Sequence, residues 1–227
     1  MIDHVRDLAS VREATDRLID AVSSWDNAAL AQPSRLPGWT RGHVLAHLSR
    51  NADALVNVLQ GLPMYKDAET RDADIEAGAG RPLDVQLADL RATADRFMAL
   101  GEEPADWDRT VELRNGVTDS ASRIPFRRWV EVALHHVDLG AGYELEDLPE
   151  EFVSREIDFL ADRWSGLENV PNTVLRSEDG RTWTTGGDSG AVTVTGPAPD
   201  LLGWLAGRRD GAALTTAGGP LPELPAL

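Results

Sequence analysis

The sequence predicts an α+β protein of two domains, an antiparallel four-helix bundle over residues 1–150 and a small α/β domain over residues 151–227. Two observations predict this division. Apolar residues recur at the three-to-four spacing of amphipathic helices through the first part of the chain. After Pro149, one further helical segment is followed by short runs with the period of two that is typical of strands.

The first two helices of the predicted bundle have recognisable ends. Apolar residues over 5–23 mark the first helix. Pro37 and Gly38 then break the chain, Thr40 is suited to cap the next helix, and an apolar stripe continues from there to Gly61. This second helix carries two of the histidines discussed below.

The remainder of the first domain is expected to contain a long loop, a hairpin and two more helices. Residues 62–81 are rich in Gly, Asp and Glu and are predicted to form the loop. The third helix is predicted over 83–100 and a short hairpin around 114–116. Pro125 opens the fourth helix, which ends at Gly140.

The second domain is expected to begin with an amphipathic helix over 152–164. Asp200 is predicted to cap a short helix over 201–205. The alternating runs predict four strands, at 173–176, 182–185, 191–195 and 213–216.

Composition restricts the class of protein. Hydrophobic residues make up 42% and charged residues 26% of the chain, so an ordinary globular core is expected. The formal charge of −16 opposes binding to nucleic acid or to an anionic membrane, and an anionic substrate would need local arginines. No apolar run approaches the ~20 residues that cross a bilayer, and the start of the chain is not a signal peptide. We therefore expect a cytoplasmic protein, either a monomer or a weak oligomer.

The chain contains no cysteine, which limits its chemistry. Disulfides, zinc–thiolate sites and a sulfur nucleophile from the protein itself are excluded. Histidines and carboxylates are then the only strong metal ligands, and any thiol chemistry needs a thiol that arrives from outside.

A candidate metal site is formed by His47, Glu131 and His135. Glu131 and His135 are four residues apart, so their side chains share one helix face, and Asp138 lies within roughly 60° of them. His47 is on the inward face of the second helix. Taken singly, a hydrogen-bonded core histidine and a surface ion pair are the commoner interpretations. Together, facing ligands in a bundle are typical of a metal site, and three ligands leave a position for water or substrate.

Several neighbouring residues are candidates for supporting roles. Asp138 is placed to orient a ligand imidazole, although an ordinary role near the helix end is equally compatible. His43 and Asn51 lie on the same helix as His47, and His43 is either a supporting or a structural residue. His136 points about 100° away from His135, which indicates packing or a surface position.

Five segments together resemble the mycothiol-dependent maleylpyruvate isomerase family, a branch of the DinB-like metalloproteins. The resemblance covers nearly the whole chain. The segments are 36–47 (LPGWTRGHVLAH), 63–65 (PMY), 131–135 (EVALH), 137–141 (VDLGA) and 206–208 (AGR).

This resemblance implies a DinB-like four-helix bundle followed by a domain similar to sterol carrier proteins. It implies Zn²⁺ or another divalent metal held by His47, Glu131 and His135, with mycothiol as the thiol cofactor. Arg208 corresponds to the family's essential arginine and would clamp a carboxylate, and Tyr65 becomes a substrate-binding candidate. The implied reaction turns maleylpyruvate into fumarylpyruvate, by thiolate addition and elimination, in the degradation of aromatic compounds through gentisate.

Three alternatives remain open at this stage. Related proteins transfer mycothiol to other electrophiles, so an S-transferase is possible. The same ligands could instead activate water in a zinc hydrolase. A non-catalytic carrier with an apolar pocket in the second domain would need no metal.

Overall fold

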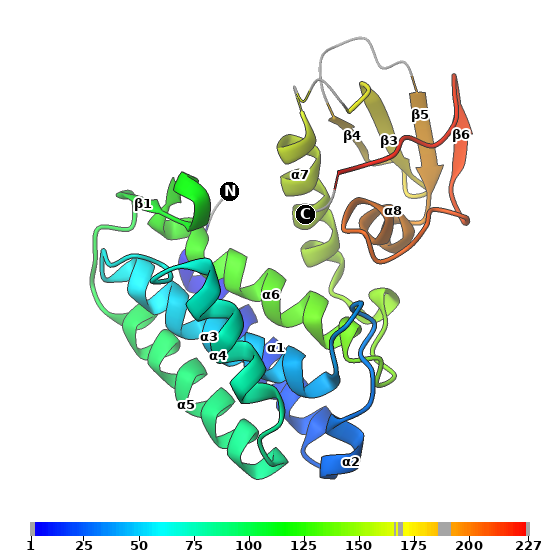
Figure 1. The fold of residues 1–227 in the computed structure, drawn as a ribbon. Coiled ribbons are helices and arrows are strands. Elements are labelled where there is room, and N and C mark those ends of the chain that lie inside the picture. The colour runs from blue at the N-terminus through cyan, green and yellow to red at the C-terminus, as the bar shows by residue number, and fades with distance from the viewer. Residues whose placement is uncertain (1–2, 166, 168–169, 186–191, 226–227) are drawn as a thin grey trace. The chain divides into compact units, whose positions relative to one another are not determined.

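The computed structural model describes residues 3–165, 167, 170–185 and 192–225 (Figure 1). The chain divides into two compact units, Met1–Tyr143 and Glu144–Leu227, whereas the sequence suggests a division after residue 150. The first unit is helical and the second combines helices with a four-stranded sheet. The predicted fold class is therefore confirmed. No helix in the described part of the chain is long and apolar enough to span a membrane.

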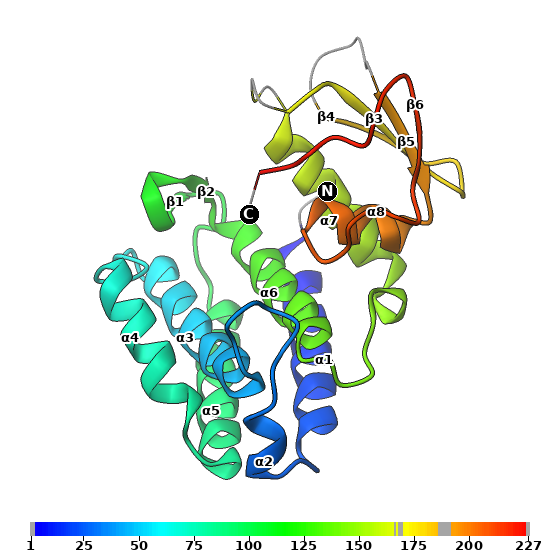
Figure 2. The same cartoon turned by 45° about the vertical axis from the view of Figure 1, so that its right-hand side comes forward.

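Four long helices form the bundle of the first unit. Each carries a continuous apolar stripe, and the stripes meet because α1 packs on α5 and α6 while α3 packs on α5 and α6 (Figure 2). All four predicted helices are confirmed. Their bounds are α1 His4–Val22, α3 Arg41–Leu59, α5 Leu83–Glu102 and α6 Ile124–Asp138.

The prediction of a long loop over 62–81 is wrong, because this stretch contains the helix α4 (Ala68–Ala79). Asp67 caps the helix by accepting a hydrogen bond from the backbone of its first turn. Only Ile75 and Gly78 are buried, so α4 lacks the apolar stripe by which a helix is recognised in a sequence. A four-residue helix, α2 (Asn27–Leu30), was likewise not predicted.

Small residues allow α4 to lie close to α3. A side chain added at Gly42 would place its Cβ 2.2 Å from the backbone oxygen of Ala79. A Cβ added at Gly78 would lie 2.8 Å from that of Ala46. The close approach fixes α4 beside α3, which becomes important for the site described below.

The predicted hairpin is confirmed between α5 and α6. Strands β1 (Thr110–Glu112) and β2 (Thr118–Ser120) pair antiparallel, joined by the 3₁₀ turn η1 (Arg114–Gly116). Asn115 adopts a left-handed backbone with φ of 61° there, a conformation that Asn tolerates better than most residues. A second 3₁₀ turn, η2 (Ala121–Arg123), leads into α6.

The second unit contains a sheet with the strand order β4-β3-β5-β6. β3 pairs parallel with β5, and the two other pairings are antiparallel. The remaining elements of this unit are helices. The bounds are η3 Leu145–Asp147, α7 Glu150–Trp164, β3 Thr173–Ser177, β4 Thr182–Thr185, β5 Val192–Gly196, α8 Ala198–Leu205 and β6 Thr215–Ala217.

Two details predicted for the second unit are wrong. Asp200 does not cap α8, because it lies inside the helix and its carboxylate contacts Arg209 at 2.7 Å. The last strand starts at Thr215, later than predicted, because Ala212 and Ala213 form a turn that is closed by the N–H of Leu214 donating to the Gly211 carbonyl. The predicted start of one strand at residue 191 lies outside the described residues.

Candidate metal centre

The packing of α3 on α6 brings together the three residues predicted to bind a metal. His47 projects from α3, and Glu131 and His135 project from successive turns of α6. One ligand atom of each lies within 4.8 Å of the others. Both imidazole Nε2 atoms approach the same Glu131 oxygen, at 3.0 Å for His47 and 3.3 Å for His135. The group could therefore hold one metal ion.

Asp138 orients His135 from the opposite side of the imidazole. Its carboxylate lies 2.8 Å from His135 Nδ1 and is fully buried. Burial by itself would lower the pKa of His135, but the hydrogen bonds to Asp138 and Glu131 raise it above its ordinary value. Asp138 thus keeps the proton on Nδ1 and leaves Nε2 directed at the centre.

Burial and hydrogen bonding have opposite effects on the pKa values of Glu131 and His47. Burial alone would raise the pKa of Glu131, yet hydrogen bonds from His135 and His47 hold that pKa well below its usual range. Burial lowers the pKa of His47, which favours the neutral imidazole that a metal requires. A carboxylate and two imidazoles are also the donors that Zn²⁺ accepts. The residues present therefore fit a divalent cation.

Two residues that were not predicted as part of the site lie against the His47 imidazole. The Trp39 ring lies with its centroid 5.5 Å from that of His47. Arg71, on α4, places Nη2 3.4 Å from His47 Nδ1. The position of Arg71 depends on α4, a helix in a stretch that was predicted to be a loop, so the sequence near Arg71 gives no sign of its place in the site.

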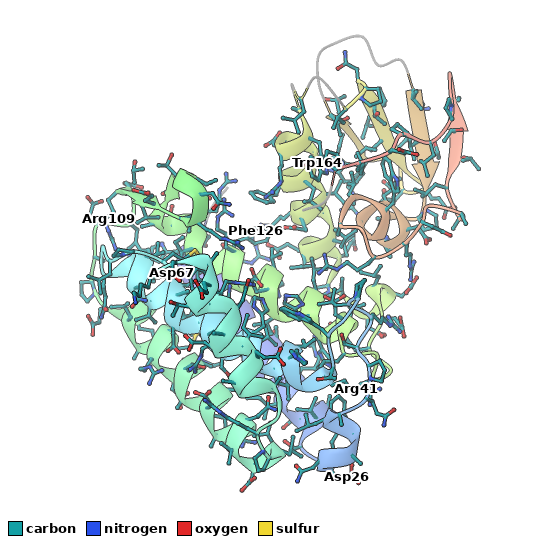
Figure 3. The ribbon with its side chains drawn as sticks, viewed as in Figure 1. Asp26, Arg41, Asp67, Arg109, Phe126 and Trp164 are labelled. Atoms are coloured by element: carbon teal, nitrogen blue, oxygen red, sulfur yellow. The ribbon has the colours of Figure 1, made fainter. Side chains whose placement is uncertain are left out.

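Tyr65 connects this region with a cavity of about 640 Å³ in the first unit. Burial raises the pKa of Tyr65, and the negative charge of Glu131 adds to this effect. The guanidinium of Arg71 lies 5.8 Å from the Tyr65 ring centroid. Asp67 and Arg109, labelled in Figure 3, also line the cavity. The prediction that Tyr65 belongs to the site remains compatible with this position.

Asn51 supports the site through a buried arginine. Arg128, one turn before Glu131 on α6, is fully buried, and Nη1 donates to the Asn51 side chain at 2.8 Å and to the Leu48 carbonyl at 2.9 Å. Burial lowers its pKa to about 10. Arg128 therefore fastens α6 to α3 next to the three candidate ligands.

Three other predicted residues lie elsewhere in the fold. His43 closes a capping box with Thr40 and contacts Glu76 at 3.1 Å. His136, predicted to pack or to lie at the surface, is buried and stacks on Tyr143. Arg208 is half-buried in the second unit, where Nη1 donates to the Ala206 carbonyl at 2.8 Å.

Comparison with known families identifies the chain. Residues 11–140 match the mycothiol maleylpyruvate isomerase N-terminal domain, and residues 147–226 match the C-terminal domain of the same family. The chain belongs to the mycothiol maleylpyruvate isomerase family.

Solved structures agree with the family assignment. The crystal structure of a mycothiol-dependent maleylpyruvate isomerase is 27% identical to this chain, with a TM-score of 0.89 over 99% of this chain and 97% of the other. A histidine-to-alanine mutant of a mycothiol-dependent maleylpyruvate isomerase matches equally well, at 27% identity and a TM-score of 0.89 over the same shares of the two chains. No curated protein sequence is similar enough to count as a match. The predicted membership of this isomerase family is confirmed.

Proposed function

We propose that the protein is a metal-dependent isomerase that uses mycothiol to convert maleylpyruvate into fumarylpyruvate. The observation that carries this proposal is the convergence of His47, Glu131 and His135 in a member of this family. The related crystal structure, 27% identical over 99% of this chain, is of a mycothiol-dependent maleylpyruvate isomerase. The partners are then a small anionic substrate and a low-molecular-weight thiol.

The residues of the chain have distinct tasks in this proposal. His47 and His135 would supply Nε2 and Glu131 a carboxylate oxygen to Zn²⁺ or another divalent ion, while Asp138 retains the Nδ1 proton of His135. A bound ion supplies positive charge that lowers the pKa of a thiol. The chain has no cysteine, so the thiol must come from outside the protein, and mycothiol is the thiol that the family suggests.

The proposed reaction regenerates the thiol in each cycle. The thiolate forms a carbon–sulfur bond with the cis double bond of maleylpyruvate, and the displaced electron pair moves onto the conjugated carbonyl. The remaining carbon–carbon single bond turns. Expulsion of the thiolate then restores the double bond in the trans form. Arg208 is proposed to hold a substrate carboxylate by paired hydrogen bonds.

The test is the ultraviolet absorbance of maleylpyruvate incubated with metal-loaded protein. We expect a change to fumarylpyruvate only when mycothiol is added, and a large loss of rate in Arg208→Ala with the metal content unchanged. Consumption of mycothiol to give a stable conjugate would support an S-transferase instead. Turnover without any thiol would favour metal-activated water, and either result would overturn the isomerase.

A further inference from the structure

Arg71 places a positive charge beside the candidate metal centre, from a helix that carries none of the three candidate ligands. It lies on α4, which is fixed against α3 by the close approach at Gly42 and Gly78. Its side chain is 17% exposed, so solvent reaches it, and its guanidinium contacts both His47 and Tyr65. Arg71 also pairs with Asp72, whose carboxylate lies 2.6 Å from Nη1 and is largely exposed.

The hydrogen bond between Arg71 and His47 is incompatible with a metal on His47. Nε2 of His47 faces the Glu131 carboxylate at 3.0 Å, and Nδ1 faces Arg71, which can only donate. The tautomer that satisfies both contacts has its proton on Nε2. If Nε2 of His47 held a metal ion, the proton of the neutral ring would reside on Nδ1. Two N–H groups would then face each other, so a metal on His47 would release Nη2 of Arg71.

A carboxylate is the ligand that best suits the released guanidinium. Its planar fork matches a carboxylate with two parallel hydrogen bonds. The Tyr65 ring centroid lies 5.8 Å from the guanidinium carbon, and a phenol hydroxyl is an additional donor for a carboxylate. In a chain with a formal charge of −16, a local cation is also what allows an anion to approach.

We propose that Arg71 and the Tyr65 hydroxyl form a carboxylate-binding subsite beside the metal centre, and that metal binding to His47 makes this subsite available. The inference deepens the proposed function, since it names the residues that would recognise an anionic substrate within the first unit. Arg71 is therefore a binding residue whose state depends on the metal.

The first test is calorimetric titration of maleate, an unreactive dicarboxylate, into Zn²⁺-loaded protein without any thiol. We expect Arg71→Gln to weaken maleate binding about 10- to 100-fold, as for a lost charged hydrogen-bond pair. In metal-free protein the same substitution should change the affinity less than threefold. Arg81→Gln is the matched control, because Arg81 pairs with Asp89 away from the site. Wild-type affinity in loaded Arg71→Gln would overturn the proposal.

The second test is the affinity for Zn²⁺ in the absence of an anion. Arg71→Gln removes a hydrogen bond that the metal must break, together with a nearby positive charge, so Zn²⁺ should bind several-fold more tightly. Weaker Zn²⁺ binding would mean that Arg71 only supports the site, and would overturn the proposal.

The carboxylate subsite and the isomerase activity can be refuted independently of each other. Maleate binding that depends on Arg71 in a protein without isomerase activity would keep the subsite and refute the isomerase. Mycothiol-dependent isomerisation with an unchanged KM in Arg71→Gln would do the reverse.

Discussion

Asp138→Asn isolates the contribution of a buried acid that would not itself touch the metal. Asp138 is fully buried, and its oxygen lies 2.8 Å from His135 Nδ1. A hydrogen bond to a charged group contributes about 1.5–3 kcal/mol, and a neutral acceptor contributes about half as much. Asn keeps an oxygen at this position but not the charge. The expected loss is about 0.8–1.5 kcal/mol, which is roughly four- to tenfold in metal affinity.

The assay is competition for Zn²⁺ against a chromophoric chelator at a fixed pH, with Asp89→Asn as the matched control. Asp89 accepts a hydrogen bond from Arg50 at 2.8 Å in the same unit and is not one of the three candidate ligands. The control should bind Zn²⁺ as the wild type does. Equal affinities in Asp138→Asn and wild type would refute the idea that Asp138 prepares His135 for the metal.

The Zn²⁺ affinities of the wild type and of Asp138→Asn should also depend differently on pH. Zn²⁺ competes with a proton on His135, whose pKa is raised by Asp138 and Glu131 against the effect of burial. Wild-type affinity should therefore fall as the pH drops below that raised pKa, by up to about tenfold per pH unit. Without the Asp138 charge the pKa of His135 is lower, so the variant loses affinity only at a lower pH. The difference between the two proteins should shrink in acid, and a difference that grows in acid would contradict this explanation.

Two further predictions concern the helices that carry the site. Gly42→Ala should lower the free energy of unfolding by about 1–3 kcal/mol in urea titrations, because its Cβ meets the Ala79 oxygen at 2.2 Å. Gly80→Ala, where nothing lies within 4 Å, should be neutral or slightly stabilising, and similar losses in both variants would disprove the close contact. Thr40→Ala should cost about 1 kcal/mol through the lost cap of α3, and an unchanged urea midpoint would show that the cap is dispensable.

A helix or strand can be predicted from the sequence when the residues that stabilise it form a regular pattern within that element. The bundle helices have one apolar stripe each, and the turn spacing of Glu131 and His135 can be deduced from helix geometry alone. α4 could not be predicted in this way, because it is stabilised by a cap at Asp67 and by small residues that fit α3. Asp200 was misassigned because a residue that often caps a helix also serves inside one when a cation such as Arg209 is near.

The least predictable parts of the site are those that depend on contacts between distant segments. Arg71 reaches His47 only because α4 docks on α3, and the two residues are 24 positions apart. Arg128 looks like an ordinary helix cation in the sequence, yet it is fully buried and bonded to Asn51. Neither charge pattern nor spacing distinguishes these arginines from those on the surface.

The metal content of protein purified without a histidine tag tests the central claim most directly. Atomic emission should find about one divalent ion per chain in the wild type, and His47→Ala and Glu131→Ala should lose most of it. His43→Ala is the matched control, because His43 lies one turn away on the same helix and contacts Thr40 and Glu76. It should retain the ion. Full metal content in His47→Ala, or equal loss in His43→Ala, would contradict a centre built from His47, Glu131 and His135.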